Sequence, residues 1–127
     1  MTATLLEHIN ITVSDPKASA AKLCKLFDWH IRWEGPAMND GYTVHVGSDT
    51  QYLALYAPPS PIKKINDDKA INMLNHIAIN VEDLETVKTK AAALGYAPFN
   101  DRQYLDNQKS FYFLDDDGIE FEIVNYD

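Results

Sequence analysis

One short pattern occurs twice in this chain and constrains its fold more than any other feature. "EHINITVSD" begins at position 7 and "NHIAINVED" at position 75, so that His8 and His76 head the two copies at an offset of 68 residues. The same offset joins further pairs of like residues: Ile9 with Ile77, Ile11 with Ile79, Val13 with Val81, Asp15 with Asp83 and Leu26 with Leu94. A persistent offset indicates a duplicated unit, and a unit of about 55 residues favours two fused half-domains over an array of short repeats.

The first copy has the pattern of a strand, a helix and three more strands. Residues 7–13 alternate apolar and polar side chains, which predicts a half-buried strand with His8, Asn10 and Thr12 on its polar face. Asp15 suits the N-cap of a helix and Pro16 its first position. The expected apolar stripe of this helix is Ala20, Leu23, Cys24 and Phe27. Three strand-like runs follow, at residues 29–34, 42–47 and 51–57.

The second copy repeats this order. A strand is expected at residues 75–81 and a helix at 83–95, with Gly95 just past the helix end. The expected helix stripe is Leu84, Val87, Ala91 and Leu94. Strands are expected at residues 110–115 and 119–126, and one more must lie within 96–109.

These patterns predict an α+β fold. Two paired βαβββ modules would form a curved mixed sheet around a cleft, with the helices outside. The predicted organisation is a single domain, 1–127, with modules at 4–57 and 73–127. The segment 58–72, which is rich in proline and polar residues, is the predicted linker.

Composition excludes several classes of partner. The chain has 127 residues and a formal net charge of −8, which argues against nucleic acid and against an anionic membrane surface. No apolar run is long enough to span a membrane, and the first residues lack the pattern of a signal peptide. Cys24 is the only cysteine, so an intrachain disulfide is impossible. A cytoplasmic location is the expectation.

Three residues form a candidate metal site. In register at the repeat offset, Glu122 in the last strand of the second unit falls opposite Ala54 in the first. If the two units pack as pseudo-symmetric halves, the polar faces would bring His8, His76 and Glu122 together. Two imidazoles and one carboxylate form the facial set that non-haem Fe(II) uses, and Mn, Ni, Co or Zn can also occupy it. The alternative is that these are ordinary polar residues of strands.

The duplicated pattern, the two histidines and "FYFLDDDGIEFEIV" resemble the vicinal oxygen chelate superfamily, which includes glyoxalase I, bleomycin-resistance proteins, fosfomycin-resistance thiol transferases and type I extradiol dioxygenases. The resemblance spans nearly the whole chain. It implies metal ligands at His8, His76 and Glu122, whereas Ala54 stands where glyoxalase I has a fourth ligand. It also implies a homodimer, in which His8 of one subunit could join His76 and Glu122 of the other.

Different branches of this superfamily match different residues. Ser110 and Tyr112 fall on substrate-contacting positions of the fosfomycin-resistance group, and Arg102 falls near its phosphonate-binding lysine. In the extradiol pattern, Gln51 stands where an acid–base histidine is expected, and Asp116 replaces a proline. Ring cleavage is therefore the weaker enzyme hypothesis.

The predicted function is a divalent-metal-dependent enzyme acting on a small oxygen-bearing substrate, of the lyase, thiol transferase or dioxygenase type. Tyr112 and Glu122 are the candidate catalytic residues. The candidate substrate-binding residues are Asn10, Tyr52, Tyr56, Arg102, Ser110 and Tyr112. The alternative is a non-catalytic protein that binds a drug or metabolite between tyrosines. The residues His30 and His45 are interpreted as ordinary strand-surface residues, and Trp29, Ile31 and Trp33 as core or interface.

Overall fold

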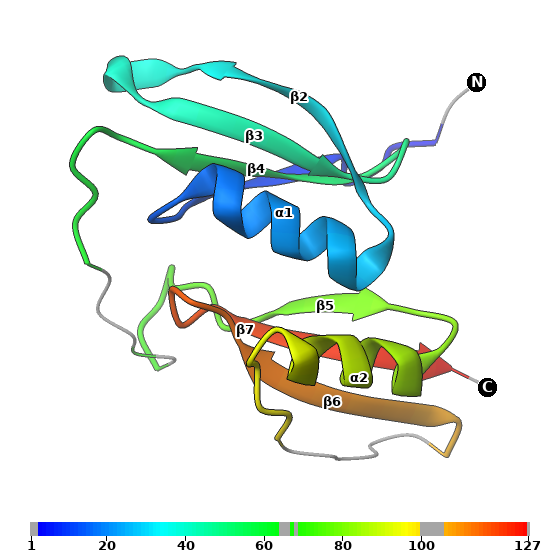
Figure 1. Cartoon of the computed structure of the whole chain (residues 1–127). Coiled ribbons are helices and arrows are strands. Elements are labelled where there is room, and N and C mark those ends of the chain that lie inside the picture. The colour runs from blue at the N-terminus through cyan, green and yellow to red at the C-terminus, as the bar shows by residue number, and fades with distance from the viewer. Residues whose placement is uncertain (1–2, 64–66, 68, 100–105, 127) are drawn as a thin grey trace. The chain divides into compact units, whose positions relative to one another are not determined.

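The structure, a computed structural model, describes residues 3–63, 67, 69–99 and 106–126. The chain divides into two compact units, residues 1–63 and 64–127, and each is considered by itself. Figure 1 shows the strands and helices of each unit. Among the described residues, none of the helices is long and apolar enough to cross a membrane.

The first unit is a four-stranded mixed sheet with one α-helix. Its elements are β1 (His8–Thr12), α1 (Pro16–Phe27), β2 (His30–Pro36), the 3-10 turn η1 (Met38–Asp40), β3 (Tyr42–Gly47) and β4 (Tyr52–Ala57). The strand order is β1-β4-β3-β2, in which β1 runs parallel to β4 and the other pairs are antiparallel. Helix α1 packs mainly on β3 and β4, so the central strands supply the core.

Local sequence explains where α1 begins and ends. The Asp15 carboxylate accepts a hydrogen bond from the Ala18 backbone N–H at 3.1 Å, and Pro16 occupies the first turn, as expected. The helix ends at Asp28, whose φ of 55° lies in the left-handed region. The buried helix residues are Pro16, Ala20, Leu23 and Leu26. Leu26 therefore takes the core position that the predicted stripe gave to Phe27, which is half-buried.

The second unit repeats the same order with three strands in its sheet. Its elements are β5 (Ile77–Asn80), α2 (Leu84–Ala93), β6 (Gln108–Leu114) and β7 (Glu120–Tyr126). The order is β5-β7-β6, with β5 parallel to β7 and β6 antiparallel to it. Asp83 caps α2 through the Thr86 backbone N–H at 3.1 Å, and Gly95 follows the helix with a φ of 90°. That left-handed φ is where glycine is favoured, so the predicted helix end is confirmed.

The predicted α+β class is confirmed by these two mixed sheets and their helices. The extra strand expected within 96–109 is represented by an isolated bridge between Phe99 and Tyr112, while residues 100–105 lie outside the described part of the chain. The module boundaries, the linker and the shared cleft stay predictions.

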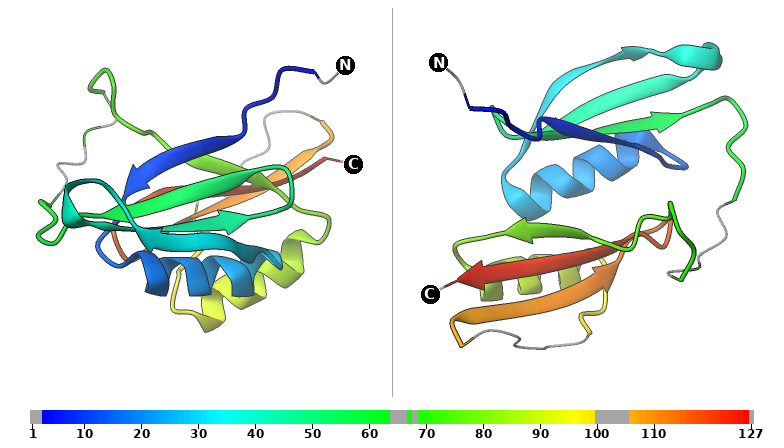
Figure 2. Two further views of the ribbon diagram at one scale, coloured as in Figure 1. Left: turned by 90° about the horizontal axis from the view of Figure 1, so that it is seen from above. Right: turned by 180° about the vertical axis from the view of Figure 1, so that it is seen from behind.

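In each unit, one sheet face packs on the helix and the opposite face carries the polar residues of interest. The helix-side core contains Val44, Val46, Leu53 and Leu55 in the first unit, and Phe111, Phe113, Phe121 and Ile123 in the second. Because side chains alternate along a strand, the residues between these face the other way. Figure 2 shows from two further sides that each helix lies along one face of its own sheet. We call the opposite face, which the helix of that unit does not cover, the open face of that unit.

Candidate functional site

The open face of the second unit brings His76 and Glu122 into contact. His76 directly precedes β5, and Glu122 lies in β7 opposite Ala78 of β5. The His76 Nε2 and Glu122 Oε1 atoms are 3.1 Å apart. Glu122 is 7% exposed, and its second carboxylate oxygen accepts from the Gln108 amide at 3.4 Å. A nearly buried carboxylate therefore has one oxygen directed at an imidazole nitrogen.

The partner of the other His76 ring nitrogen, Nδ1, bears on the chemistry of the contact between Nε2 and Glu122. The Nδ1 atom is 2.6 Å from the Asn75 side-chain oxygen, which can only accept, so the contact is a hydrogen bond when Nδ1 carries the hydrogen. In the neutral ring, Nε2 is then a bare acceptor that faces an acceptor oxygen of Glu122. The contact is favourable only when a proton or a metal cation lies between them. A carboxylate oxygen of Glu120 lies 4.0 Å from Nδ1.

Tyr112 and Ser110 lie on the same open face. Tyr112 of β6 pairs with Glu122 of β7, and its ring meets the His76 ring edge-on with centroids 5.8 Å apart. Ser110 lies two residues earlier in β6 and therefore on the same side of the sheet. Tyr112 and Ser110 are 4% and 6% exposed. The second unit thus brings together four of the residues that the sequence singled out.

In the first unit, His8 has a surrounding that parallels that of His76. Its Nδ1 atom is 2.9 Å from the carboxylate of Glu7, the residue just before it. In both histidines the preceding side chain holds Nδ1, and Nε2 is the nitrogen left for a ligand. His8 pairs with Tyr52 of β4, and the two rings stack at 4.7 Å between centroids.

The other predicted residues of the first unit lie on β1 and β4 and differ in whether they have a donor atom for a ligand. Tyr52, Ala54 and Tyr56 share one face of β4, as expected, and Asn10 of β1 lies opposite Ala54. Ala54 is 1% exposed, and its methyl group offers no donor atom. The Tyr56 hydroxyl donates to the Met38 carbonyl at 2.8 Å, so it holds the turn after β2.

Sequence reasoning missed a set of rings on this open face. His45 was interpreted as a surface residue, yet its ring stacks on Tyr52 at 4.7 Å and the Trp33 indole meets it edge-on at 5.3 Å. The Arg32 guanidinium carbon lies 4.4 Å from the Tyr52 ring centroid. We call the rings of His8, Tyr52, His45 and Trp33, together with the Arg32 guanidinium group, the ring array. Burial, followed by repulsion from His8 and Arg32, lowers the pKa of His45, and Glu7 opposes that shift.

Hairpin length is the signal that could have found His45. The loop between β3 and β4 spans residues 48–51, so Gly47 pairs with Tyr52 and His45 with Ala54. The loop between β6 and β7 spans residues 115–119, so Leu114 pairs with Glu120 and Tyr112 with Glu122. This one-residue difference makes His45 the counterpart of Tyr112, whereas a constant offset of 68 matches it with the core residue Phe113.

Not every predicted site residue can be placed in one cluster. His8 belongs to the first unit, whereas His76 and Glu122 belong to the second. Arg102 lies outside the described residues. Within the described ranges, no group of three or more His, Cys, Asp or Glu side chains is placed to hold a metal ion. The convergence of His8 with His76 and Glu122 therefore stays a prediction.

Comparison with models of protein families identifies the family of this chain. The model of the Glyoxalase/Bleomycin resistance protein/Dioxygenase superfamily matches residues 5–123. The chain belongs to this superfamily. The resemblance inferred from the two strand-heading histidines is thereby confirmed. A search of curated protein sequences found no match.

Solved structures agree on the fold of this superfamily member. A glyoxylase/bleomycin resistance protein/dioxygenase domain from Frankia sp. EAN1pec is similar with a TM-score of 0.81 and 20% identity, covering 99% of this chain and 100% of that one. The fosfomycin resistance protein FosX of Listeria monocytogenes, complexed with Mn(II) and sulfate, has a TM-score of 0.71 and 18% identity, covering 100% and 95%. Glyoxalase I of Leishmania major, described as trypanothione-dependent, has a TM-score of 0.78 and 17% identity, covering 97% and 87%.

Proposed function

We propose that this chain is a divalent-metal-dependent enzyme that acts on a small oxygen-bearing substrate, as a lyase, thiol transferase or dioxygenase. Its proposed metal ligands are His8, His76 and Glu122. The observation that carries the proposal is the 3.1 Å contact between His76 Nε2 and Glu122 Oε1, two atoms of types that bind divalent metals. A divalent cation would satisfy both atoms at once.

The donor atoms of the second unit fit such an ion. His76 Nε2 and Glu122 Oε1 are 3.1 Å apart, and both are atom types that bind divalent ions, so the two residues could hold one ion between them. Asn75 orients His76, and Gln108 contacts the outer oxygen of Glu122. Supporting contacts of this kind hold ligands in position and set the histidine tautomer. His8 is oriented by Glu7 in the same way and is the proposed third ligand.

The residues present suggest a division of roles. When bound, a divalent ion supplies Lewis acidity toward substrate oxygens. Because Ala54 offers no fourth donor, a three-ligand set leaves coordination positions open to the substrate. Tyr112, next to His76, is proposed to orient the substrate or to give it a proton, and Glu122 is proposed to act both as ligand and in catalysis. Ser110 and Asn10 are proposed substrate contacts on the same open faces, and Arg102 is proposed as a further one from the sequence.

Comparison with FosX supports a divalent metal, since that relative was crystallised with Mn(II). The ion proposed for this chain is one of Fe, Mn, Ni, Co and Zn. A homodimer remains part of the proposal, and light scattering at two protein concentrations tests it.

Metal binding is the direct test. Protein purified without nickel and treated with EDTA should bind Mn(II) or Zn(II) with one strong site per chain by calorimetry. His76→Ala and Glu122→Ala should each weaken that site by about a hundredfold or more, because each removes a direct ligand. His30→Ala, which removes a histidine paired with Asp49 at 3.4 Å, is the matched control and should change nothing. Absence of a strong site in the unaltered protein would overturn the proposal.

The alternative function is binding of a drug or metabolite without catalysis. The ring array favours this alternative, because aromatic faces bind small planar molecules whether or not a metal is present. Turnover assays separate the two: a pure binding protein keeps its ligand affinity in His76→Ala and converts no substrate.

A further inference from the structure

The open face of the first unit has large rings around small residues. One row across the four strands is Asn10, Ala54, His45 and Trp33, and the next row is Thr12, Tyr56, Thr43 and Gly35. Ala54 is 1% exposed and Gly35 is buried, so larger side chains cover both of these small residues. The arrangement leaves aromatic surface directed away from α1.

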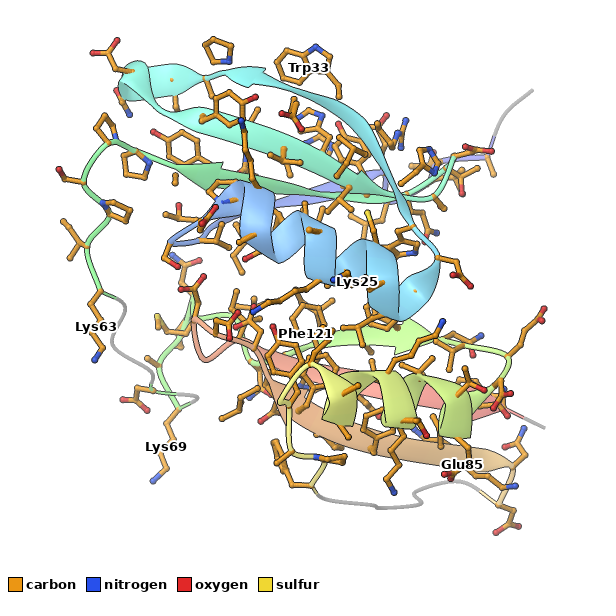
Figure 3. All side chains as sticks on the ribbon, in the orientation of Figure 1. Lys25, Trp33, Lys63, Lys69, Glu85 and Phe121 are labelled. Atoms are coloured by element: carbon orange, nitrogen blue, oxygen red, sulfur yellow. The ribbon has the colours of Figure 1, made fainter. Side chains whose placement is uncertain are left out.

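Trp33 is the most exposed ring of the array. Its residue is 52% exposed, although indole is among the largest apolar groups. A Cβ atom added to Gly35 would lie 2.8 Å from the Trp33 ring, so the indole lies over the strand at Gly35. Figure 3 shows Trp33 on the side of β2 away from α1. One ring face is thus held by the sheet, and the ring still presents open surface to a ligand.

Arg32 places a positive charge beside these rings. It stacks on Tyr52, and no described residue forms a salt bridge or hydrogen bond with it. The carboxylates of Glu7, Asp49 and Glu34 have other partners: Glu7 contacts His8, Asp49 contacts His30, and Glu34 contacts Tyr42 and Lys17. In a chain of net charge −8, this is a local place where an anion is favoured.

Thr43 supplies an independent indication of a ligand. It is 6% exposed, and its hydroxyl has no hydrogen-bond partner among the described residues. In register it lies between Tyr56 and Gly35, and the indole of Trp33 covers that same Gly35. A buried hydroxyl without a partner is costly, so a polar ligand group that reaches it gains a hydrogen bond.

From these four observations we propose that the open face of the first unit binds a planar aromatic carboxylate. The aromatic ring of the ligand stacks on Trp33 and the neighbouring rings, and Arg32 binds its carboxylate through the guanidinium fork. The inference names the ligand class of the site described above, and the role of that ligand as a substrate rests on the proposed function.

Fluorescence titration tests the proposal. The chain has two tryptophans, so Trp29→Phe leaves Trp33 as the only indole reporter. In that background, metal-free protein should bind 1-naphthoate and quench Trp33, and 1-naphthalenemethanol should bind about tenfold more weakly, since it lacks the charge. Arg32→Gln should reduce naphthoate affinity to the level of the alcohol, whereas Trp33→Ala, followed by calorimetry, should weaken both ligands.

Lys17→Gln is the matched control. Lys17 also lies over a tyrosine ring, that of Tyr42 at 5.0 Å, but it belongs to α1 and pairs with Glu34. Lys17→Gln removes one positive charge, as Arg32→Gln does, and should leave naphthoate binding unchanged. Equal affinities for naphthoate and its alcohol, no effect of Arg32→Gln, or an equal loss in Lys17→Gln would each overturn the inference.

The same samples separate this inference from the proposed function. If naphthoate binds as expected and no metal binds, the metal-enzyme proposal fails and the aromatic site stands. If metal binds tightly and naphthoate does not, the aromatic site fails alone. Both Arg32 and Trp33 are exposed, and circular dichroism of each variant verifies that the fold is retained.

Discussion

His76 Nε2 lies 3.1 Å from Glu122 Oε1 while Asn75 holds the opposite nitrogen of the same ring. His76 adjoins the strand next to that of Glu122, and the residues are 46 positions apart in sequence. The pair is therefore made by the parallel pairing of β5 with β7. This contact between an imidazole nitrogen and a carboxylate oxygen is the basis of the first two predictions.

Replacing the carboxylate by an amide should separate metal binding from folding. In Glu122→Gln the side-chain N–H can donate to His76 Nε2, so we expect thermal stability equal to or above that of the unaltered protein in the absence of metal. Mn(II) affinity should fall by about a hundredfold, because an amide is a poorer ligand than a carboxylate. Glu85→Gln, at an exposed position of α2, is the control that should change neither quantity. A variant with unchanged Mn(II) affinity would contradict the assignment of Glu122 as a ligand.

Asn75 is expected to act through His76 as a positioning residue. Asn75→Ala removes the acceptor at Nδ1 and should lower metal affinity about tenfold, as for other groups that orient a ligand. Asn75→Asp keeps an acceptor oxygen and should restore most of the affinity. Calorimetric titration of the three proteins measures this. Equal losses in the alanine and aspartate variants would show that the Nδ1 contact has no role.

Asp115 should make stability depend on pH. Its carboxylate accepts from the backbone N–H groups of Asp117 and Ile119 at 2.9 and 2.8 Å, yet burial raises its pKa to about 6. The folded pKa exceeds the unfolded value near 4, so the folded state binds the proton more tightly. Stability from this group is therefore greatest below about pH 4 and is lost as pH rises through about 6.

Asp115→Asn tests this sign. The amide oxygen can still accept both backbone hydrogen bonds and carries no charge to bury. After allowance for solvent screening, the variant should be more stable than the unaltered protein by about 1–2 kcal/mol at pH 7 and about equal to it at pH 4. Urea denaturation from pH 4 to 7.5 measures the difference. Asp49→Asn, in the exposed loop between β3 and β4, should show no such trend, and a pH-independent loss in Asp115→Asn would contradict the argument.

Thr43→Val should stabilise the protein. Valine has nearly the shape of threonine and removes the buried hydroxyl that has no partner among the described residues. The expected gain in the free energy of unfolding is about 1 kcal/mol, because an unsatisfied buried polar group is lost. Chemical denaturation measures it, with Thr50→Val in the exposed loop as the control. A loss of stability would show that the hydroxyl already has a partner.

The sequence alone determined the elements and their faces. Period-2 alternation placed His8 and Asn10 on one face of their strand, and Tyr52 and Tyr56 on one face of theirs, because successive side chains of a strand point to opposite sides. Capping by Asp15 and the glycine after α2 are local chemistry, readable from a few neighbouring residues. The repeat predicted the matching order of the two units. Together with the two strand-heading histidines and "FYFLDDDGIEFEIV", it carried the resemblance to the superfamily.

Tertiary structure decided which of these residues meet. The register of a hairpin depends on the length of its loop, and loops that differ by one residue placed His45, not a core residue, opposite Ala54. Arg32 and Trp33 join the ring array beside a register shift between Ile31 and Trp33, which simple alternation does not reveal. Gln108 reaches Glu122 only because β6 pairs with β7. Contacts of this kind depend on the pairing of strands distant in sequence, so no local pattern in the chain specifies them.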